Sequence, residues 1–314
     1  MPRFLPQRSD IMILNHWEHT EYVEEDQYHL FSKFQLVIPT SVSLSYNTAV
    51  YVSNGEKRLE AIYDPALKGI RPLKPCTGAA NRDLRLYLDA LSNENITVLA
   101  IDGLMGTGKT STAVEWAIDT HLKNVKMFLN PEDSFNRGGH KIVIAKPHVN
   151  SGGESYGHLP GDINQKIDPT IVNFTQYFDR LHQAGYEKLR DAGYVEILPL
   201  GFVRGMDASN VTVIADECQN TKELITLVTR KANKSRIILL GDTSPFQIDR
   251  SGNTPDKNGL TDMIDLLRGA PYFQHIEMKT VEHVVRSEET RDVVRRLFKK
   301  HGHDISTWGT IQRG

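Results

Sequence analysis

One glycine-rich stretch of the chain has the residue types and the spacing that phosphate binding requires. Gly103, Gly106, Gly108, Lys109 and Thr110 supply the pattern G-x-x-x-x-G-K-T. In such a loop, glycines let backbone N–H groups approach phosphate oxygens, the lysine neutralises phosphate charge, and the threonine hydroxyl ligates magnesium. The pattern predicts a nucleoside triphosphate and Mg²⁺ here. The residues expected to contact the nucleotide are Gly103, Leu104, Met105, Gly106, Thr107, Gly108, Lys109, Thr110 and Ser111.

The loop requires a strand before it and a helix after it, and the flanking residues predict both. Residues 96–102 form an apolar, β-branched run typical of a buried strand. Residues 113–118 place apolar side chains at helical spacing. This order disfavours an ordinary glycine-rich turn, because strand, loop and helix follow one another as a P-loop requires.

A pair of acids ends a second apolar strand. Residues 211–215 read VTVIA and are followed by Asp216 and Glu217. Asp216 is placed to hold the magnesium shell, and Glu217 to orient and deprotonate an attacking water. Two acids at a strand end are otherwise turn residues. Their position after a P-loop in a βα chain favours hydrolysis.

Four further polar residues are candidates for the same site. Asp242 and Gln247 follow a predicted strand at 236–240 and could sense the γ-phosphate, with turn chemistry as the alternative. Arg286 precedes a predicted helix and could stabilise charge on that phosphate, or pair with the glutamates that follow it. Arg204, between glycines, could grip nucleic-acid phosphate, reach a neighbouring subunit's nucleotide, or remain solvated.

The alternation of strands and helices after residue 71 predicts an α/β fold with a mostly parallel sheet. The expected strands are 96–102, 142–145, 195–198, 211–215, 236–240 and 273–278. The expected helices include 79–91, 168–189, 260–267 and one after residue 287.

Residues 1–70 lack this alternation, so we expect a small β-rich N-terminal appendage, with the nucleotide domain at 71–314. The elements expected near this boundary are a strand at 34–38, a hairpin of 49–53 and 57–63 with a type I′ turn at Asn54-Gly55, and a basic linker at 71–75.

The composition of the chain limits its structural class, its location and its partners. The 314 residues are 39 % hydrophobic and 24 % charged, which suits a globular chain, and the net charge of −2 means that nucleic-acid binding needs a local basic patch. No membrane span and no signal-peptide core are visible, and two cysteines suit a reducing compartment, so a cytoplasmic location and no membrane partner are expected. His121, His140, His148 and His158 lack metal-ligand spacing and are predicted to lie in surface loops.

Six segments together resemble the PhoH-like family of P-loop ATPases, of phage or bacterial type, which is related to the core of superfamily 1 helicases. The resemblance covers roughly residues 70–297. The segments are GLMGTGKT at 103–110, KPHVNSGGESYGHLPGDINQKIDP at 146–169, VEILPLGFVRG at 195–205, VIADECQN at 213–220, GDTSPFQID at 241–249 with NGL at 258–260, and VVRSEETRDVV at 284–294.

The resemblance implies a RecA-like, three-layer αβα P-loop NTPase that hydrolyses ATP. It also implies action on RNA or single-stranded DNA and a homo-oligomer, with a hexameric ring favoured. Lys146 stands where the family usually has arginine, and with Arg204 it is a candidate for nucleic-acid or intersubunit contact. Gln247 lies two residues further along than in the family pattern. We expect no nuclease domain of the kind fused to some relatives, because residues 1–70 are too short for it and lack its acidic cluster.

We therefore expect Mg²⁺-dependent ATP hydrolysis coupled to binding or remodelling of RNA or single-stranded nucleic acid. Lys109 and Arg286 would balance the phosphates, Thr110 and Asp216 would hold Mg²⁺, Glu217 would activate water, and Gln247 would report the γ-phosphate. The alternative is a nucleotide-dependent switch or binding module with little turnover. A small-molecule kinase is disfavoured, because an Asp-Glu pair suits attack by water.

Overall fold

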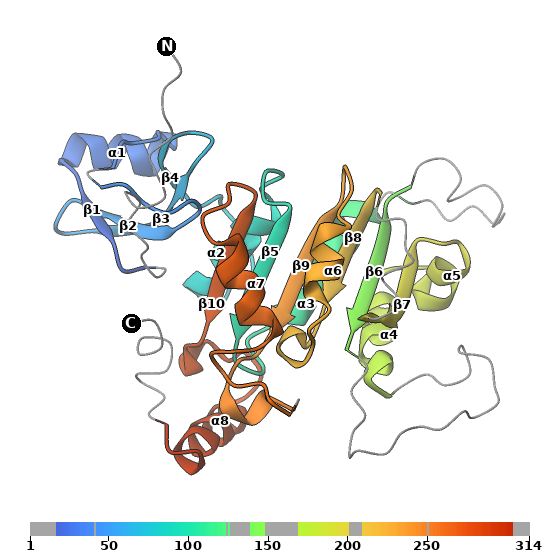
Figure 1. The fold of residues 1–314 in the computed structure, drawn as a ribbon. Helices are drawn as coiled ribbons and strands as arrows, with labels where there is room; N and C mark the ends of the chain where they lie inside the picture. Colours follow the sequence, from blue (N-terminus) through green and yellow to red (C-terminus); the bar gives the residue numbers. More distant parts are fainter. Residues whose placement is uncertain are drawn as a thin grey trace, which may run out of the picture.

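The computed structural model describes residues 17–40, 42–123, 125, 139–147, 169–200, 209–249 and 251–303. Its centre is a six-stranded sheet in the order β10-β5-β9-β8-β6-β7, with every neighbouring pair parallel (Figure 1). The strands are β5 (Val98–Gly103), β6 (Lys141–Lys146), β7 (Val195–Pro199), β8 (Val211–Ala215), β9 (Arg236–Gly241) and β10 (Phe273–Met278). The six predicted strands are all present in this sheet.

Helices cover both faces of the sheet, because alternate strand residues point to opposite sides. Leu99 and Ile101 of β5 belong to an apolar cluster with α2, α3, α4 and α5, whereas Val98 and Ala100 belong to one with α6 and α7. The helices are α2 (Arg82–Leu91), α3 (Lys109–His121), α4 (Pro169–Leu181), α5 (Gly185–Asp191), α6 (Leu224–Thr229) and α7 (Gly259–Leu267). This arrangement confirms the predicted RecA-like αβα fold with a parallel sheet.

The last helix, α8 (Glu288–Lys300), lies beyond the carboxyl edge of the sheet (Figure 1). Its buried Val294 and Phe298 pack with Leu104 and Val281. Among the described residues, no helix is long and apolar enough to cross a lipid bilayer.

The predicted single helix at 168–189 is wrong, because the chain turns between α4 and α5. Gly185 has a φ of +69°, a left-handed conformation that favours glycine. The backbone N–H of the next residue, Tyr186, donates to Asp179 Oδ1 at 2.8 Å. The apolar pattern of the two helices is continuous in sequence and therefore conceals the turn.

His121 lies in a helix and not in a surface loop as predicted, and His140, in the loop before β6, is only partly exposed. His121 ends α3, its ring stacks on that of His140 with centroids 3.6 Å apart, and both rings hydrogen-bond to Thr212 Oγ1. Burial, with the nearby His140 and Arg236, lowers the pKa of His121 to about 3. The pair is therefore neutral at physiological pH. His148 and His158 lie outside the described residues.

The N-terminal region forms a separate four-stranded sheet in the order β1-β2-β3-β4, covered by α1 (Glu25–Phe34). Its strands are β1 (Thr20–Tyr22), β2 (Ala49–Ser53), β3 (Arg58–Asp64) and β4 (Gly69–Pro72). The predicted strand at 34–38 is wrong. Residues up to Phe34 form α1, whose Tyr28 and Phe31 pack on the sheet, and Ile38 makes one isolated bridge to Ile70.

The predicted hairpin is present, but its turn is not type I′. Strand pairing ends at Ser53 and Arg58, which leaves a four-residue loop. Asn54 lacks the positive φ that a type I′ turn requires, and its Oδ1 accepts the backbone N–H groups of Glu56 and Lys57. Hydrogen bonds to the side chain of Asn54 therefore stabilise this loop, in place of the type I′ backbone conformation expected from Asn-Gly.

Residues 71–75 are not a free linker, because Arg71 and Pro72 belong to β4. Arg71 is 9 % exposed; its guanidinium donates to Asp64 at 2.9 Å and to both oxygens of Asp89 on α2 at 2.8 Å. These bonds attach the N-terminal sheet to the core. The predicted division into two domains between residues 70 and 71 stays a proposal. That boundary falls within β4, and all of β4 belongs to the N-terminal sheet.

Candidate functional site

The strand order brings the P-loop and three further predicted site residues to one edge of the sheet. β9 lies between β5, which leads into the P-loop, and β8, which Asp216 follows directly. Asp242 follows β9 and Lys146 ends β6, the other neighbour of β8. Because all these strands are parallel, their carboxyl ends meet where α/β folds bind ligands.

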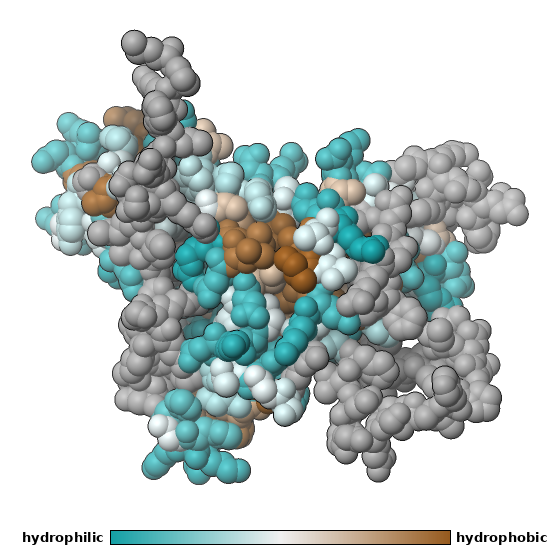
Figure 2. Space-filling view, in the orientation of Figure 1, coloured by the Kyte–Doolittle hydropathy of each residue, from teal (hydrophilic) through white to brown (hydrophobic). Residues whose placement is uncertain are grey.

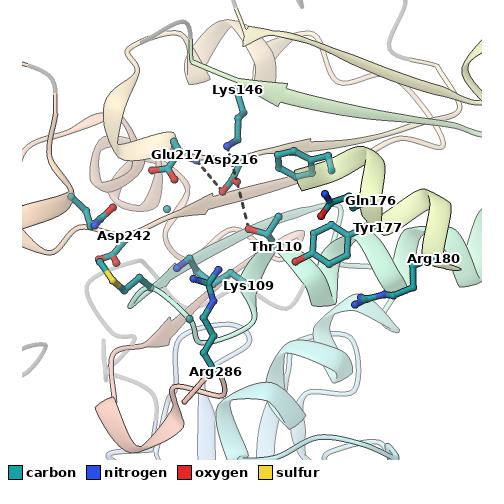
Figure 3. A pocket seen from close by; sticks show the side chains of 15 residues that line it. Lys109, Thr110, Lys146, Gln176, Tyr177, Arg180, Asp216, Glu217, Asp242 and Arg286 are labelled. Atoms are coloured by element: carbon teal, nitrogen blue, oxygen red, sulfur yellow. Dashed lines mark hydrogen bonds and ion pairs between the residues drawn. The ribbon is translucent and has the colours of Figure 1, made fainter. Parts of the chain in front are cut away.

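A cavity of about 500 Å³ opens at this edge (Figure 3). It is lined by ten of the predicted site residues, Met105, Gly106, Lys109, Thr110, Lys146, Asp216, Glu217, Asp242, Gln247 and Arg286. Arg204 lies outside the described residues. The site is therefore assembled from segments far apart in the sequence.

The P-loop has the backbone that a phosphate cradle needs. Gly106 and Gly108 have φ values of +79° and +88°, and a Cβ on Gly106 would lie 3.1 Å from Val284 Cγ1. Lys109 Nζ donates to the carbonyls of Gly103 and Leu104, at 2.5 Å and 3.0 Å. Its ammonium is thus held over the loop, near the helix N-terminus that attracts anions.

The remaining loop residues support this cradle from beneath. Leu104 and Thr107 are buried, and Thr107 Oγ1 donates to the carbonyl of Leu104 at 2.7 Å. The Ser111 hydroxyl donates to the carbonyl of Gly108 at 3.1 Å. These side chains shape the loop, and the atoms that face the cavity come from Met105, Gly106, Lys109 and Thr110.

Asp216 lies between two groups that reach it from opposite sides (Figure 3). Thr110 Oγ1 donates to Asp216 Oδ2 at 3.5 Å, and Lys146 Nζ lies 3.8 Å from the same oxygen. Burial and the charge of Glu217 raise the pKa of Asp216, while Lys146 and Lys109 oppose the rise. A cation beside Asp216 would therefore favour its charged form.

Mg²⁺ prefers oxygen ligands and in nucleotide sites is held by one or two protein groups together with substrate phosphates. The hydroxyl of Thr110 and the carboxylate of Asp216 both face the cavity beside the phosphate loop. The donor set fits Mg²⁺.

Gln219 organises the acidic pair and was not identified from the sequence. This residue is fully buried, and its Nε2 donates to Glu217 Oε2 at 2.8 Å and to the carbonyl of Gln247 at 3.1 Å. Its Oε1 accepts the backbone N–H of Asp242 at 3.1 Å. Glu217 itself has a φ of 56°, a conformation that is unusual for a residue with a side chain. Gln219 thus links β8 to the segment that follows β9.

Asp242 lines the cavity, and one of its buried carboxylate oxygens is unpaired among the described residues. It is 6 % exposed, and its Oδ1 accepts the N–H and the hydroxyl of Ser244. Its Oδ2 has no hydrogen-bond partner among the described residues. Burial raises the pKa of Asp242, and Lys109 opposes this effect. A donor on a bound ligand or water would satisfy the free oxygen.

Arg286 lines the cavity beside the P-loop. The backbone N–H of Val285 donates to the carbonyl of Gly106 at 2.9 Å, which fixes the segment that carries Arg286. Of the two glutamates proposed as alternative partners, Glu288 pairs with Arg291 and Arg295, at 2.7 Å and 3.3 Å, and Glu289 hydrogen-bonds to Ser287. The geometry therefore leaves Arg286 directed toward the phosphate site.

Four residues of α4 also line the cavity and were not expected there: Phe174, Gln176, Tyr177 and Arg180. Two aromatic residues of this helix, Phe174 and Phe178, are buried in the core. Helical periodicity identifies the apolar face of a helix. It does not show which part of the fold that face contacts, so the position of Tyr177 in the cavity lining was not predictable from the sequence.

Comparisons with known proteins agree with this site. A family model described as PhoH-like protein matches residues 78–297. A PhoH-like protein of Bacillus subtilis is 30 % identical over 284 residues, which cover 87 % of this chain and 81 % of that protein. Protein PhoH2 of Thermobispora bispora is 28 % identical over 70 % of this chain, and a PhoH-like protein of Mycobacterium bovis is 30 % identical over 66 %.

The chain spans about half the length of the last two relatives, 48 % and 54 % respectively. The match to the family model nevertheless covers more than half of this chain and includes the P-loop, the acidic pair and Arg286. The chain belongs to the PhoH-like family of P-loop NTPases.

Proposed function

We propose that the protein catalyses Mg²⁺-dependent hydrolysis of ATP and couples it to binding or remodelling of RNA or single-stranded nucleic acid. The observation that carries the proposal is the placement of Asp216 and Glu217. Asp216 lies 3.5 Å from the Thr110 hydroxyl beneath the P-loop, and Glu217 lines the same cavity. This is the arrangement needed to bring water to a terminal phosphate.

Each residue has a role that its position supports. Lys109 exchanges its contacts with the loop carbonyls for phosphate oxygens, and Arg286 balances the charge from the other side of the loop. Mg²⁺, held by Thr110 and Asp216, would supply further positive charge to the phosphates. Glu217, oriented by Gln219, accepts the proton of the attacking water. Gln247 and Asp242 contact the terminal phosphate or its water.

Replacement of the base tests hydrolysis directly. Glu217→Gln should lower the ATP turnover number by about 100-fold or more, because general-base catalysis contributes about that much. Affinity for a fluorescent ATP analogue should change little. Glu187→Gln, on the exposed surface of α5, is the matched control and should behave as wild type. Negligible wild-type turnover, unchanged by Glu217→Gln, would instead support the nucleotide-dependent switch.

The nucleic-acid part of the proposal rests on family resemblance and needs its own measurement. ATP turnover should rise when single-stranded RNA or single-stranded DNA is added, and less with duplexes. No stimulation by any of them would contradict the coupling to nucleic acid. A cytoplasmic location belongs to the same proposal and rests on composition.

We also infer a homo-oligomer, with a hexameric ring favoured by the family resemblance. Helicases of this lineage complete their site with a second motor domain, so a neighbouring copy would complete it here. An apolar patch on the face that carries α7 supports assembly, and α6 and α7 expose Ile225 and Leu266 (Figure 2). A monomer that retains full ATPase activity at high dilution would contradict this inference.

A further inference from the structure

Strand register places Lys146 beside Asp216. β6 and β8 are parallel neighbours, and Ala145 pairs with Ala215. The next residues, Lys146 and Asp216, therefore leave the sheet side by side at its carboxyl edge. Lys146 was expected to contact nucleic acid or another subunit, but the register directs it toward the phosphate cavity of its own chain.

The ammonium of Lys146 is held near this carboxylate without being hydrogen-bonded. Its Nζ lies 3.8 Å from Asp216 Oδ2, a distance that allows ion pairing but exceeds that of a hydrogen bond. Its side chain is 21 % exposed, and Nζ lies 5.1 Å from the centroid of the Phe174 ring. Within the described ranges, its three N–H donors have no hydrogen-bond acceptor. Lys109, by contrast, donates to two carbonyls.

The positions of the two lysines suit opposite sides of a terminal phosphate. Lys109 rises from the P-loop and Lys146 from the far side of Asp216, with both lining one cavity (Figure 3). The end of a triphosphate chain lies next to the acidic pair when its other phosphates occupy the loop. A group with several negative oxygens there would satisfy the free donors of Lys146.

We propose that Lys146 is a second phosphate-binding lysine of this site, which contacts the terminal phosphate of ATP within its own chain. When no nucleotide is present, the ammonium of Lys146 balances the negative charge of Asp216. When a nucleotide binds, Lys146 favours ATP over ADP. This rests on the proposed function only in taking ATP as the ligand; it does not require turnover.

The test is a comparison of triphosphate and diphosphate affinity. Lys146→Met keeps the aliphatic stem against Phe174 and removes the charge. With Mg²⁺ present, its affinity for a non-hydrolysable ATP analogue should fall about tenfold or more, whereas its affinity for ADP should fall less than about threefold. Lys146→Arg should restore most of the ATP preference. Lys141→Met is the matched control, because Lys141 lies at the opposite end of β6 and pairs with Glu196.

Several outcomes would overturn the proposal. Equal losses for ATP analogue and ADP would show a general electrostatic effect, and unchanged affinities for both would remove Lys146 from the site. If only nucleic-acid affinity fell, Lys146 would be a nucleic-acid contact. Thermal unfolding of each variant separates these results from misfolding. A protein that binds both nucleotides without hydrolysing ATP would refute the proposed ATPase and still decide the role of Lys146.

Discussion

At the residue scale, the side chain of Gln219 connects three residues of the site, Glu217, Asp242 and Gln247. One amide contacts the side chain of Glu217, the carbonyl of Gln247 and the N–H of Asp242. All three partners belong to residues that line the cavity. Buried amides that satisfy several polar groups hold those groups in one geometry. Gln219 is therefore a positioning residue for the proposed base.

Gln219→Leu should reduce ATP turnover more than nucleotide affinity. The change keeps the buried volume but frees Glu217 to adopt other rotamers and leaves the backbone N–H of Asp242 unpaired, at a cost of about 1–3 kcal/mol, while the carbonyl of Gln247 keeps its bond from Asn220 Nδ2. We expect the turnover number to fall about 10- to 100-fold, since a base contributes about 10²-fold or more. The affinity for an ATP analogue should fall less than about threefold. Steady-state kinetics and a fluorescence titration measure the two effects.

Gln274→Leu is the control for this experiment. Gln274 is also buried, on β10, and its amide has no hydrogen-bond partner among the described residues. Its replacement should leave turnover unchanged. Equal kinetic effects in both variants would show that Gln219 acts only through stability.

The sequence was sufficient for residues whose roles depend on local spacing. The P-loop, Asp216 and Glu217 each lie within one short motif, and the structure brings them together. Gln219 is only three residues beyond Asp216, but its function depends on contact with Gln247 and Asp242. That contact is made across the sheet and has no local signal.

At the element scale, α8 connects the P-loop to the segment after β9. Phe298 packs with Leu104 of the loop, and the Phe246 ring meets it edge to face with centroids 5.1 Å apart. Phe246 immediately precedes Gln247, so one apolar cluster contacts both the nucleotide loop and the candidate γ-phosphate sensor.

Phe298→Leu should weaken nucleotide binding although Phe298 does not line the cavity. The lost ring contacts should destabilise the protein by about 1–3 kcal/mol, and we expect the affinity for an ATP analogue to fall about threefold or more, as for residues that couple packed elements. Phe31→Leu, at a fully buried position of α1, is the matched control. It should cost similar stability in thermal unfolding and leave nucleotide affinity unchanged. An unchanged affinity in Phe298→Leu would mean that α8 does not support the site.

The strands of the central sheet were more predictable than the helices. Buried parallel strands are short, continuous apolar runs, and all six appear where the pattern indicates. α1 was missed because only Tyr28 and Phe31 mark its buried face. The turn between α4 and α5 was missed because it depends on one glycine and a distant carboxylate.

At the scale of the whole molecule, Arg71 joins the N-terminal sheet to the nucleotide core. It bridges Asp64 on β3 and Asp89 on α2, and α2 in turn reaches the P-loop helix, since the Tyr87 hydroxyl donates to the carbonyl of Lys109 at 3.2 Å. Ala49 and Ile62 of the N-terminal sheet also belong to the main core cluster. The two sheets therefore share one body.

Arg71→Met should strongly destabilise the protein. The substitution leaves two buried carboxylates without their cation, a change that typically costs about 3–5 kcal/mol. Urea denaturation should show a lower midpoint, and Arg71→Met combined with Asp89→Leu should recover part of the loss. Arg190→Met, which breaks an exposed pair with Asp191, should change the midpoint little. If Arg71→Met were equally mild, the two sheets would not depend on this bridge.

The order of strands has a consequence for synthesis of the chain on the ribosome. Among the described residues, β5, which leads into the P-loop, pairs with β9 on one side and β10 on the other, and these begin at Arg236 and Phe273. A nascent chain that already displays the complete glycine loop thus has no partner on either side of β5. Parallel pairing of segments so distant in sequence is slow and exposes apolar edges until it is complete. ATP capture should therefore begin only after β10 leaves the exit tunnel, and the unfinished chain is a natural client for chaperones.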